Sequence, residues 1–158
     1  MKKITYKTSK RLSGYSTCFR QWNAKHSHCH FLHGYDLIFV LHFKAEALDH
    51  HHWVWDFGFL KNPYQRIDNL SIKEWFNYMF DHTVIIAEDD PEIEAFRDLA
   101  KKDLIQLRTV PYYSTEKIAE FILKKLNPVV KKHSNQRVEL YKVEVWENQN
   151  NMGAFEIE

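Results

Sequence analysis

The strongest strand pattern lies between His33 and Ala45, where every second residue from Leu37 to Phe43 is apolar, the period of two that an extended chain produces. The apolar positions form one set for each face of a strand, namely Leu37, Phe39, Leu41 and Phe43, and Ile38 with Val40. Because both faces are apolar, we expect a strand that is covered on both sides. Residues 15–25 predict a strand before it, and residues 52–57 predict a short extended segment after it.

The middle of the chain has the spacing and the capping residues of helices. Ser71 and Glu74 form a predicted capping box, and the apolar positions that follow at helical spacing are Ile72, Trp75, Phe76 and Met79. Asp90 followed by Pro91 is typical of a helix start, with an apolar stripe of Ile93, Phe96 and Leu99. Two helices are therefore predicted between the first strands and the last third of the chain.

The last third of the chain predicts another helix and then two strands. Ser114 or Thr115 begins this helix, and Asn127-Pro128 is expected to end its regular part because proline interrupts a helix. Residues 137–148 alternate, and residues 152–158 are expected to pair with them as a hairpin. This order predicts one α+β domain over residues 1–158, with a mostly antiparallel sheet and helices packed on one face, since repeating βαβ connections are missing.

Composition and charge narrow the possible functions. Basic residues number 22 and acidic residues 21, and the resulting net charge of +1 argues against a large nucleic-acid interface. No stretch approaches the ~18–20 apolar residues of a membrane span, and residues 1–7 lack the apolar run of a signal peptide. We therefore expect a cytoplasmic protein whose two cysteines, Cys18 and Cys29, are free thiols.

Ten histidines are present, and five of them fall between His26 and His42. If the first strand continues through His26 and His28, both imidazoles leave the same face, and a tight reversal would bring His33 beside them. Three imidazoles with an open fourth position are a common catalytic arrangement for Zn²⁺. His30 lies within the predicted turn and is a weaker candidate. Ordinary surface or core histidines remain the alternative.

Cys29 lies inside this cluster. A thiol beside a metal and imidazoles has a lowered pKa and can act as a base or nucleophile, although Cys29 could also be a structural zinc ligand or inert. Cys18, among strand residues, is predicted to be inert. Asp81-His82, directly after a predicted helix, can form a proton relay in which the carboxylate fixes the imidazole tautomer, but the dipeptide alone is weak evidence.

In the predicted strand, Glu147 lies on the same face as the apolar residues Val143 and Val145, because the three are spaced two residues apart. A carboxylate on an apolar face is costly unless a ligand binds it. The N3–H and 2-amino group of a pterin would offer it two parallel donors. Glu139 lies on the same face, which weakens the parity argument, and a solvated strand end is the alternative.

These residues occur in motifs that resemble the 6-pyruvoyltetrahydropterin synthase and 6-carboxytetrahydropterin synthase family. The matching segments appear in chain order at 22–26, 29–35, 53–61, 80–82, 114–116 and 145–147. The resemblance implies the tunnelling fold, whose sheets join into an oligomeric barrel, often a hexamer, with active sites at subunit interfaces. It also implies Zn²⁺, a catalytic cysteine and a small-molecule substrate, 7,8-dihydroneopterin triphosphate.

The resemblance gives each candidate residue a role. Cys29 would take a carbon-bound proton, the Asp81-His82 pair would transfer the compensating proton, and Glu147 would hold the pterin ring. Thr115 and Glu116 belong to the motif that lines the pterin pocket. The short spacing from Cys29 to the next zinc histidine is typical of the carboxy-forming branch, which supplies 7-deazaguanine and queuosine synthesis. A pyruvoyl-forming enzyme and a catalytically silent pterin-binding or metal-binding homologue are the alternatives.

The chain departs from the family pattern in the metal motif. Tyr35 replaces the second histidine of His-Gly-His, so the third zinc ligand is missing from its usual place. We predict a metal set of His26, His28 and His33, in which His28 either accompanies His26 or replaces it. A further departure is a helix-sized insertion around residues 84–110. The candidate residues for binding the triphosphate are Arg20, Lys25 and Lys61, chosen for their positive charge alone.

Overall fold

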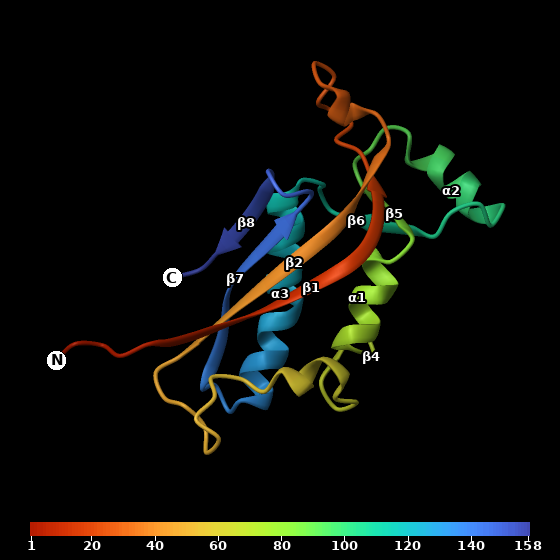
Figure 1. The fold of residues 1–158 in the computed structure, drawn as a ribbon. Coiled ribbons are helices and arrows are strands. Elements are labelled where there is room, and N and C mark those ends of the chain that lie inside the picture. The colour runs from red at the N-terminus through yellow and green to blue at the C-terminus, as the bar shows by residue number, and fades with distance from the viewer.

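The computed structural model describes residues 1–158 as a six-stranded sheet with three helices (Figure 1). The strands follow the order β6-β5-β1-β2-β7-β8 across the sheet. Their bounds are Tyr6–Phe19 for β1, His33–Ala45 for β2, Thr83–Ala87 for β5, Leu107–Val110 for β6, Val138–Trp146 for β7 and Met152–Glu156 for β8. The helices are α1 (Ile72–Phe80), α2 (Ile93–Lys101) and α3 (Thr115–His133), and no helix is both long and apolar enough to cross a membrane.

Two long antiparallel strands form the centre of the sheet. Their register runs from Tyr6 opposite Ala45 to Phe19 opposite His33, with a bulge after Leu12. The predicted strand at 33–45 is therefore confirmed. The predicted strand at 15–25 is wrong in its bounds, because β1 begins nine residues earlier, at Tyr6, and ends at Phe19. No strand covers residues 52–57, which lead instead into the 3₁₀ turn η2 (Phe57–Lys61).

Further strands lie on both sides of the central pair, antiparallel on one side and parallel on the other. On one side β7 and β8 add as the predicted antiparallel hairpin. On the other side β5 lies parallel to β1, and β6 lies parallel to β5. The sheet is therefore mixed. The neighbours β5 and β6 are joined through α2, and a connection through a helix can link adjacent parallel strands. The segment predicted as a helical insertion, 84–110, contains α2 and also most of β5 and all of β6.

One face of the sheet is covered by α1 and α3, and the main core lies between them and the sheet. The capping box of α1 is confirmed, because Ser71 and Glu74 bond each other's backbone. The predicted end of α3 is wrong, since the helix continues through Pro128 to His133. The buried side chains of Leu126 and Val130 on either side hold this part of α3 against the core. That packing offsets the cost of about 3 kcal/mol that proline imposes on a helix interior.

The short helix α2 is an exception to the prediction of helices on one face. Its buried Phe96 packs with Val84 and Ile86 of β5, whereas the alternate residues of β5, Ile85 and Ala87, face the main core. Because successive strand residues point to opposite faces, α2 covers the other side of this edge. Asp90 is not the cap of α2, whose first residues have no side-chain cap.

Short extra elements complete the fold. Residues 28–30 form the 3₁₀ turn η1 within the connection between β1 and β2, called here the β1–β2 loop (residues 20–32). It rises above the end of the sheet, on the side where α2 lies (Figure 1). A two-stranded sheet of β3 (Arg66–Ile67) and β4 (Leu70–Ser71) precedes α1. The predicted site residues therefore lie in loops and at strand ends around one end of the sheet.

Candidate active site

The β1–β2 loop carries the thiol and two of the histidines proposed as metal ligands. Because β1 ends at Phe19, neither His26 nor His28 lies on a strand, and the parity argument that placed them on one face is wrong. Both side chains are exposed. Cys29 lies in η1, where its backbone N–H donates to the Ser27 hydroxyl at 3.2 Å.

His33 is the histidine whose surroundings are most defined. It begins β2, and its ring packs edge-on against Phe19 at 4.9 Å and against Tyr35 at 5.5 Å between ring centroids. Its Nδ1 lies 2.7 Å from the carbonyl oxygen of Phe31. Donation from Nδ1–H to a carbonyl fixes the tautomer and leaves Nε2 free, as in histidines that bind a metal.

The predicted three-histidine set is not assembled within one chain. No group of three or more His, Cys, Asp and Glu side chains is placed to hold a metal ion. Tyr35 packs with Phe19 and His33 at the position where the family motif has its missing histidine. One chain alone therefore does not fit a three-ligand zinc centre, and no chemical step is assigned to a metal.

Glu147 follows β7 and is half-buried beside His33 and the start of α3. Burial raises the pKa of its carboxyl above the ordinary value, the nearby His33 opposes that shift, and Glu116 adds to it. Its backbone N–H donates to Asn151 at 3.1 Å, which fixes the turn into β8. A partly desolvated carboxylate in this position can accept two donors from a planar ligand.

The start of α3 lies against the same carboxylate. Ser114 caps the helix by accepting from Lys117 N–H at 3.0 Å, and the Thr115 hydroxyl donates to Glu116 at 3.2 Å. Gly153 of β8 allows this approach, because a Cβ there would lie 2.3 Å from the Thr115 hydroxyl oxygen. The predicted substrate-binding residues Glu147, Thr115 and Glu116 are thus brought together.

Tyr113 is a site residue that the sequence analysis missed. Its ring stacks on Phe19 at 4.2 Å, and its buried hydroxyl has no hydrogen-bond partner. Burial raises the pKa of the Tyr113 phenol well above its ordinary value, and Glu147 and Tyr35 raise it further. An aromatic residue directly before the capping Ser114 was the available signal, but many aromatic residues in this chain are ordinary core.

The Asp81-His82 pair has the geometry of a relay, but it lies elsewhere in the chain. Asp81 Oδ1 is 2.7 Å from His82 Nδ1, and the two side chains are 42% and 77% exposed. The backbone of His82 bonds to Ser16 of β1 just before β5 begins. Three strand steps separate β5 from β7, or about 14 Å. Neither Cys29 nor Glu147 lines the cavity of about 500 Å³ that His82 borders.

Comparison with known proteins assigns this arrangement to a family. The model of a family described as 6-pyruvoyl tetrahydropterin synthase matches residues 2–158. The chain belongs to this family. A curated 6-carboxy-5,6,7,8-tetrahydropterin synthase of Rickettsia typhi is 35% identical over 65 residues, which span 41% of this chain and 41% of that protein.

Solved structures share the fold of this 6-pyruvoyl tetrahydropterin synthase family member. An uncharacterised protein of Wolinella succinogenes superposes with a TM-score of 0.80 at 19% identity, over 98% of this chain and 99% of that one. The 6-pyruvoyl tetrahydropterin synthase of Plasmodium falciparum has a TM-score of 0.64 at 17% identity, over 96% and 97%. The Caenorhabditis elegans synthase has a TM-score of 0.60 at 19% identity, over the full length of both chains. These likenesses confirm the predicted tunnelling fold for the single chain, and its joining into an oligomeric barrel stays a prediction.

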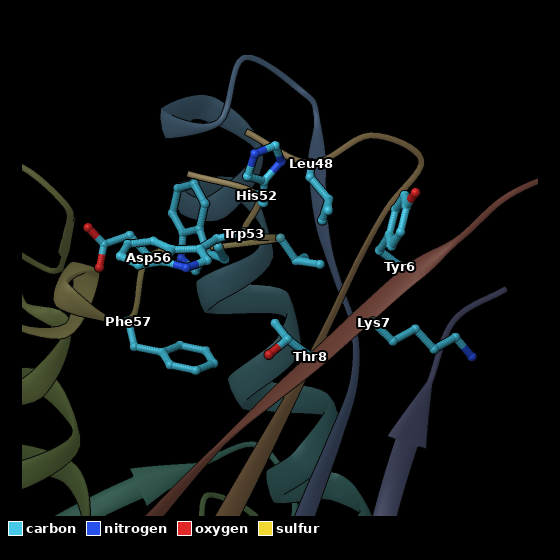
Figure 2. A pocket seen from close by; sticks show the side chains of 10 residues that line it. Tyr6, Lys7, Thr8, Leu48, His52, Trp53, Asp56 and Phe57 are labelled. Atoms are coloured by element: carbon cyan, nitrogen blue, oxygen red, sulfur yellow. The ribbon is translucent and has the colours of Figure 1, made fainter. Parts of the chain in front are cut away.

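A second cavity in this family member, of about 530 Å³, lies at the opposite end of the β1–β2 hairpin. Figure 2 shows Phe57 directed toward Thr8 across it, while Lys7 points away. Tyr6 also lines it, thirteen residues along β1 from Phe19, which corresponds to about 40 Å of strand. None of the predicted catalytic, substrate-binding or metal residues lines this cavity, so it is separate from the candidate site.

Proposed function

We propose that the chain is a zinc-dependent 6-carboxy-5,6,7,8-tetrahydropterin synthase-like lyase that acts on 7,8-dihydroneopterin triphosphate, in a route toward 7-deazaguanine and queuosine. The observation that carries this proposal is Glu147, a half-buried carboxylate that lies beside the start of α3. Family membership supports a lyase of pterin metabolism. The similarity to the 6-carboxy-5,6,7,8-tetrahydropterin synthase of Rickettsia typhi and the short Cys29-to-His33 spacing favour the carboxy product.

In this proposal Glu147 binds the ring of the substrate. Its two carboxylate oxygens accept from the N3–H and 2-amino donors of the pterin, a paired geometry that favours one ring orientation. Thr115 and Glu116 border the same position from the first turn of α3. The partial positive charge of this helix end favours the ionised form of a carboxylate nearby.

The proton transfers are assigned to Cys29 and to the Asp81-His82 pair. Cys29 as thiolate takes a carbon-bound proton of the substrate side chain, and His82, oriented by Asp81, returns a proton. With one water consumed, the two outer carbons of the side chain leave as acetaldehyde and the triphosphate leaves as a separate product. The carbon attached to the ring stays as the carboxyl group, and the electrons it loses reduce the dihydropterin ring to the tetrahydropterin. The exposed position of the His82 imidazole suits exchange with solvent.

An assembled oligomer would bring these groups together. Proton transfer needs a direct hydrogen bond or one bridging water, whereas about 14 Å of sheet separates the His82 and Glu147 positions within one chain. We therefore propose a homo-oligomer, with a hexamer as the predicted form, in which His82 of one chain acts on a substrate held by another. The cytoplasmic location stays a prediction.

Zinc dependence is a separate part of this proposal. His33, with Nδ1 held by the Phe31 carbonyl, is the best prepared ligand. Zinc content per chain should be measured for the wild type and for His26→Ala, His28→Ala, His33→Ala and Tyr35→Phe. Loss of zinc in His33→Ala and in either loop variant supports the predicted set. Full zinc content in His28→Ala removes His28 from it.

The activity test is a product analysis. Purified protein, with and without added Zn²⁺, is incubated with 7,8-dihydroneopterin triphosphate, and the products are identified by mass. Acetaldehyde together with the 6-carboxy product supports the proposal. A pyruvoyl product would assign the other branch of the family, and binding without turnover would assign a silent homologue.

A further inference from the structure

The β1–β2 loop, which carries Cys29, is tied by a buried ion pair to the turn after β5 and the helix α2 that follows it, together called the α2 segment (residues 88–101). Directly after β1, Arg20 donates from Nε and Nη2 to the two carboxylate oxygens of Asp90, each at 2.7 Å. The Asp90 side chain is 1% exposed and that of Arg20 is 17% exposed. This paired geometry joins residues 70 positions apart, and it is called the Arg20–Asp90 clamp below.

Asp90 is held rigidly from its own side. It also accepts from the backbone N–H of Glu92 at 2.9 Å, and its own N–H donates to Ala87 at the end of β5. Burial alone would raise the pKa of Asp90, yet the hydrogen bonds from Arg20 and Glu92 outweigh burial and leave the pKa below its ordinary value. The carboxylate is therefore a fixed, ionised anchor at the edge of the sheet.

From this anchor and the residue that follows Arg20, hydrogen bonds reach the backbone of Cys29 and of His30, the next residue. Arg20 Nη1 donates to the carbonyl of His30 at 3.3 Å. The next residue, Gln21, donates its backbone N–H to the carbonyl of Cys29 at 2.8 Å. Trp22 adds a third tie to the α2 segment, from its indole N–H to Asp89 at 3.1 Å.

Apart from these ties, the stretch around Cys29 is held to the body of the protein by Gln21, whose Nε2 donates to the carbonyl of Tyr113 at 3.4 Å. None of the three residues of η1 is buried, so the turn has no side chain anchored in the core. The remaining local bonds, from Cys29 N–H to the Ser27 hydroxyl, from His30 to the Ser27 carbonyl and from Phe31 N–H to the His28 carbonyl, lie within the loop itself. They fix the shape of the turn but not its position over the sheet.

We propose that Arg20 and Asp90 are positioning residues that place Cys29 over the end of the sheet. This assignment gives the α2 segment, which lies outside the candidate site, a part in the reaction, and it makes Arg20 unavailable as a triphosphate ligand. The expected effect on turnover rests on the proposed function, whereas the expected effect on the position of Cys29 does not.

The test separates the two consequences. In a Cys18→Ser background, Arg20→Gln, Asp90→Asn and the exchanged pair Arg20→Asp with Asp90→Arg are compared with Arg97→Gln. Arg97 is the matched control, because its ion pair with Glu94 is exposed on the same α2 segment. The rate of Cys29 alkylation by iodoacetamide, the thermal midpoint, kcat and KM are measured for each variant.

Breaking the clamp should speed alkylation of Cys29 several-fold and lower kcat about 10- to 100-fold with KM within about twofold, because small displacements of a reacting group are costly. The exchanged pair should recover part of both effects. Alkylation and kcat that match Arg97→Gln in folded variants would overturn the proposal. So would a rise in KM at constant kcat, which would assign Arg20 to phosphate binding.

If Arg20→Gln does not fold, Trp22→Phe removes the Asp89 tie without exposing a buried charge and is read in the same way. Trp22→Phe with alkylation unchanged, together with Asp90→Asn unchanged, counts against the clamp. If the wild type turns over no pterin, the proposed function fails. The alkylation rates still decide whether Arg20 and Asp90 position the thiol.

Discussion

At the scale of single residues, the candidate site is a set of polar groups that the fold leaves partly desolvated and without partners. The Glu147 carboxyl has a raised pKa because of burial, and the Tyr113 hydroxyl is buried with no partner. Groups of this kind are unfavourable in the free protein and mark positions where a ligand contributes the missing bonds. Two substitutions test this view from opposite directions.

Glu147→Gln should raise KM for the dihydropterin substrate by about 10- to 100-fold, since hydrogen bonds to a charged acceptor contribute about 1.5–3 kcal/mol. Binding needs the ionised carboxylate, whose pKa is raised, so affinity of the wild type should increase as pH rises through that pKa. Below it the carboxyl is protonated and affinity is lost. Titration of KM against pH should show this step in the wild type and not in Glu147→Gln.

The control is Glu156→Gln, an exposed carboxylate on the neighbouring strand β8. The same pKa shift has a consequence for stability. Because folding raises the pKa of Glu147, ionisation above its unfolded pKa opposes folding, so Glu147→Gln should not lower the free energy of unfolding at neutral pH. A substrate KM that is equal in both variants would remove Glu147 from the binding site.

Tyr113→Phe should raise the free energy of unfolding by about 1 kcal/mol, because the hydroxyl that it removes is buried without a partner and the stacked ring is kept. Chemical denaturation of the substrate-free protein measures the change. Tyr112→Phe, with a neighbouring side chain that is 57% exposed, should leave stability unchanged. A loss of stability in Tyr113→Phe would mean that the hydroxyl has a partner in the free protein.

At the scale of elements, the sequence predicted those whose signals are local. The alternation in β2 and the Ser71–Glu74 box of α1 depend on neighbours in the chain, and both were placed correctly. The end of α3 and the cap of α2 depend on distant partners. Pro128 stays helical because the helix packs on the core, and the Asp90 carboxylate binds Arg20 and the Glu92 N–H ahead of α2, whose cap residue is Glu92.

Gly153→Ala should destabilise the protein by about 1–3 kcal/mol, because the added Cβ would lie 2.3 Å from the Thr115 hydroxyl and 2.8 Å from the Glu116 nitrogen. The start of α3 must then move away from β8, and KM should rise along with the loss of stability. Denaturation and steady-state kinetics measure the two effects. Gly58→Ala, whose added Cβ would meet only the Asp56 side chain, at 3.0 Å, is the control, and equal stability of both variants would contradict the prediction.

At the scale of the whole molecule, the motifs predicted the family and the fold. They did not predict that the site residues of one chain lie in two separate groups. Glu147, Thr115, Glu116 and His33 gather at the start of α3, as their motifs implied. Asp81 and His82 follow α1 on the far side of β1, and a linear motif carries no information on that separation. The argument that put His26 and His28 on one strand face failed for a different reason, because β1 ends seven residues before His26.

If His82 of one chain serves Cys29 of another, two inactive variants should restore activity when mixed. Cys29→Ala and His82→Ala are each expected to lose turnover, because each lacks one proton-transfer group. After joint refolding at equal amounts, about a quarter of the sites in random mixed oligomers would contain both intact groups. Recovery near that fraction, measured as kcat per site, supports a shared site. If the mixture stays as inactive as the separate variants while forming mixed oligomers, Cys29 and His82 act within one chain.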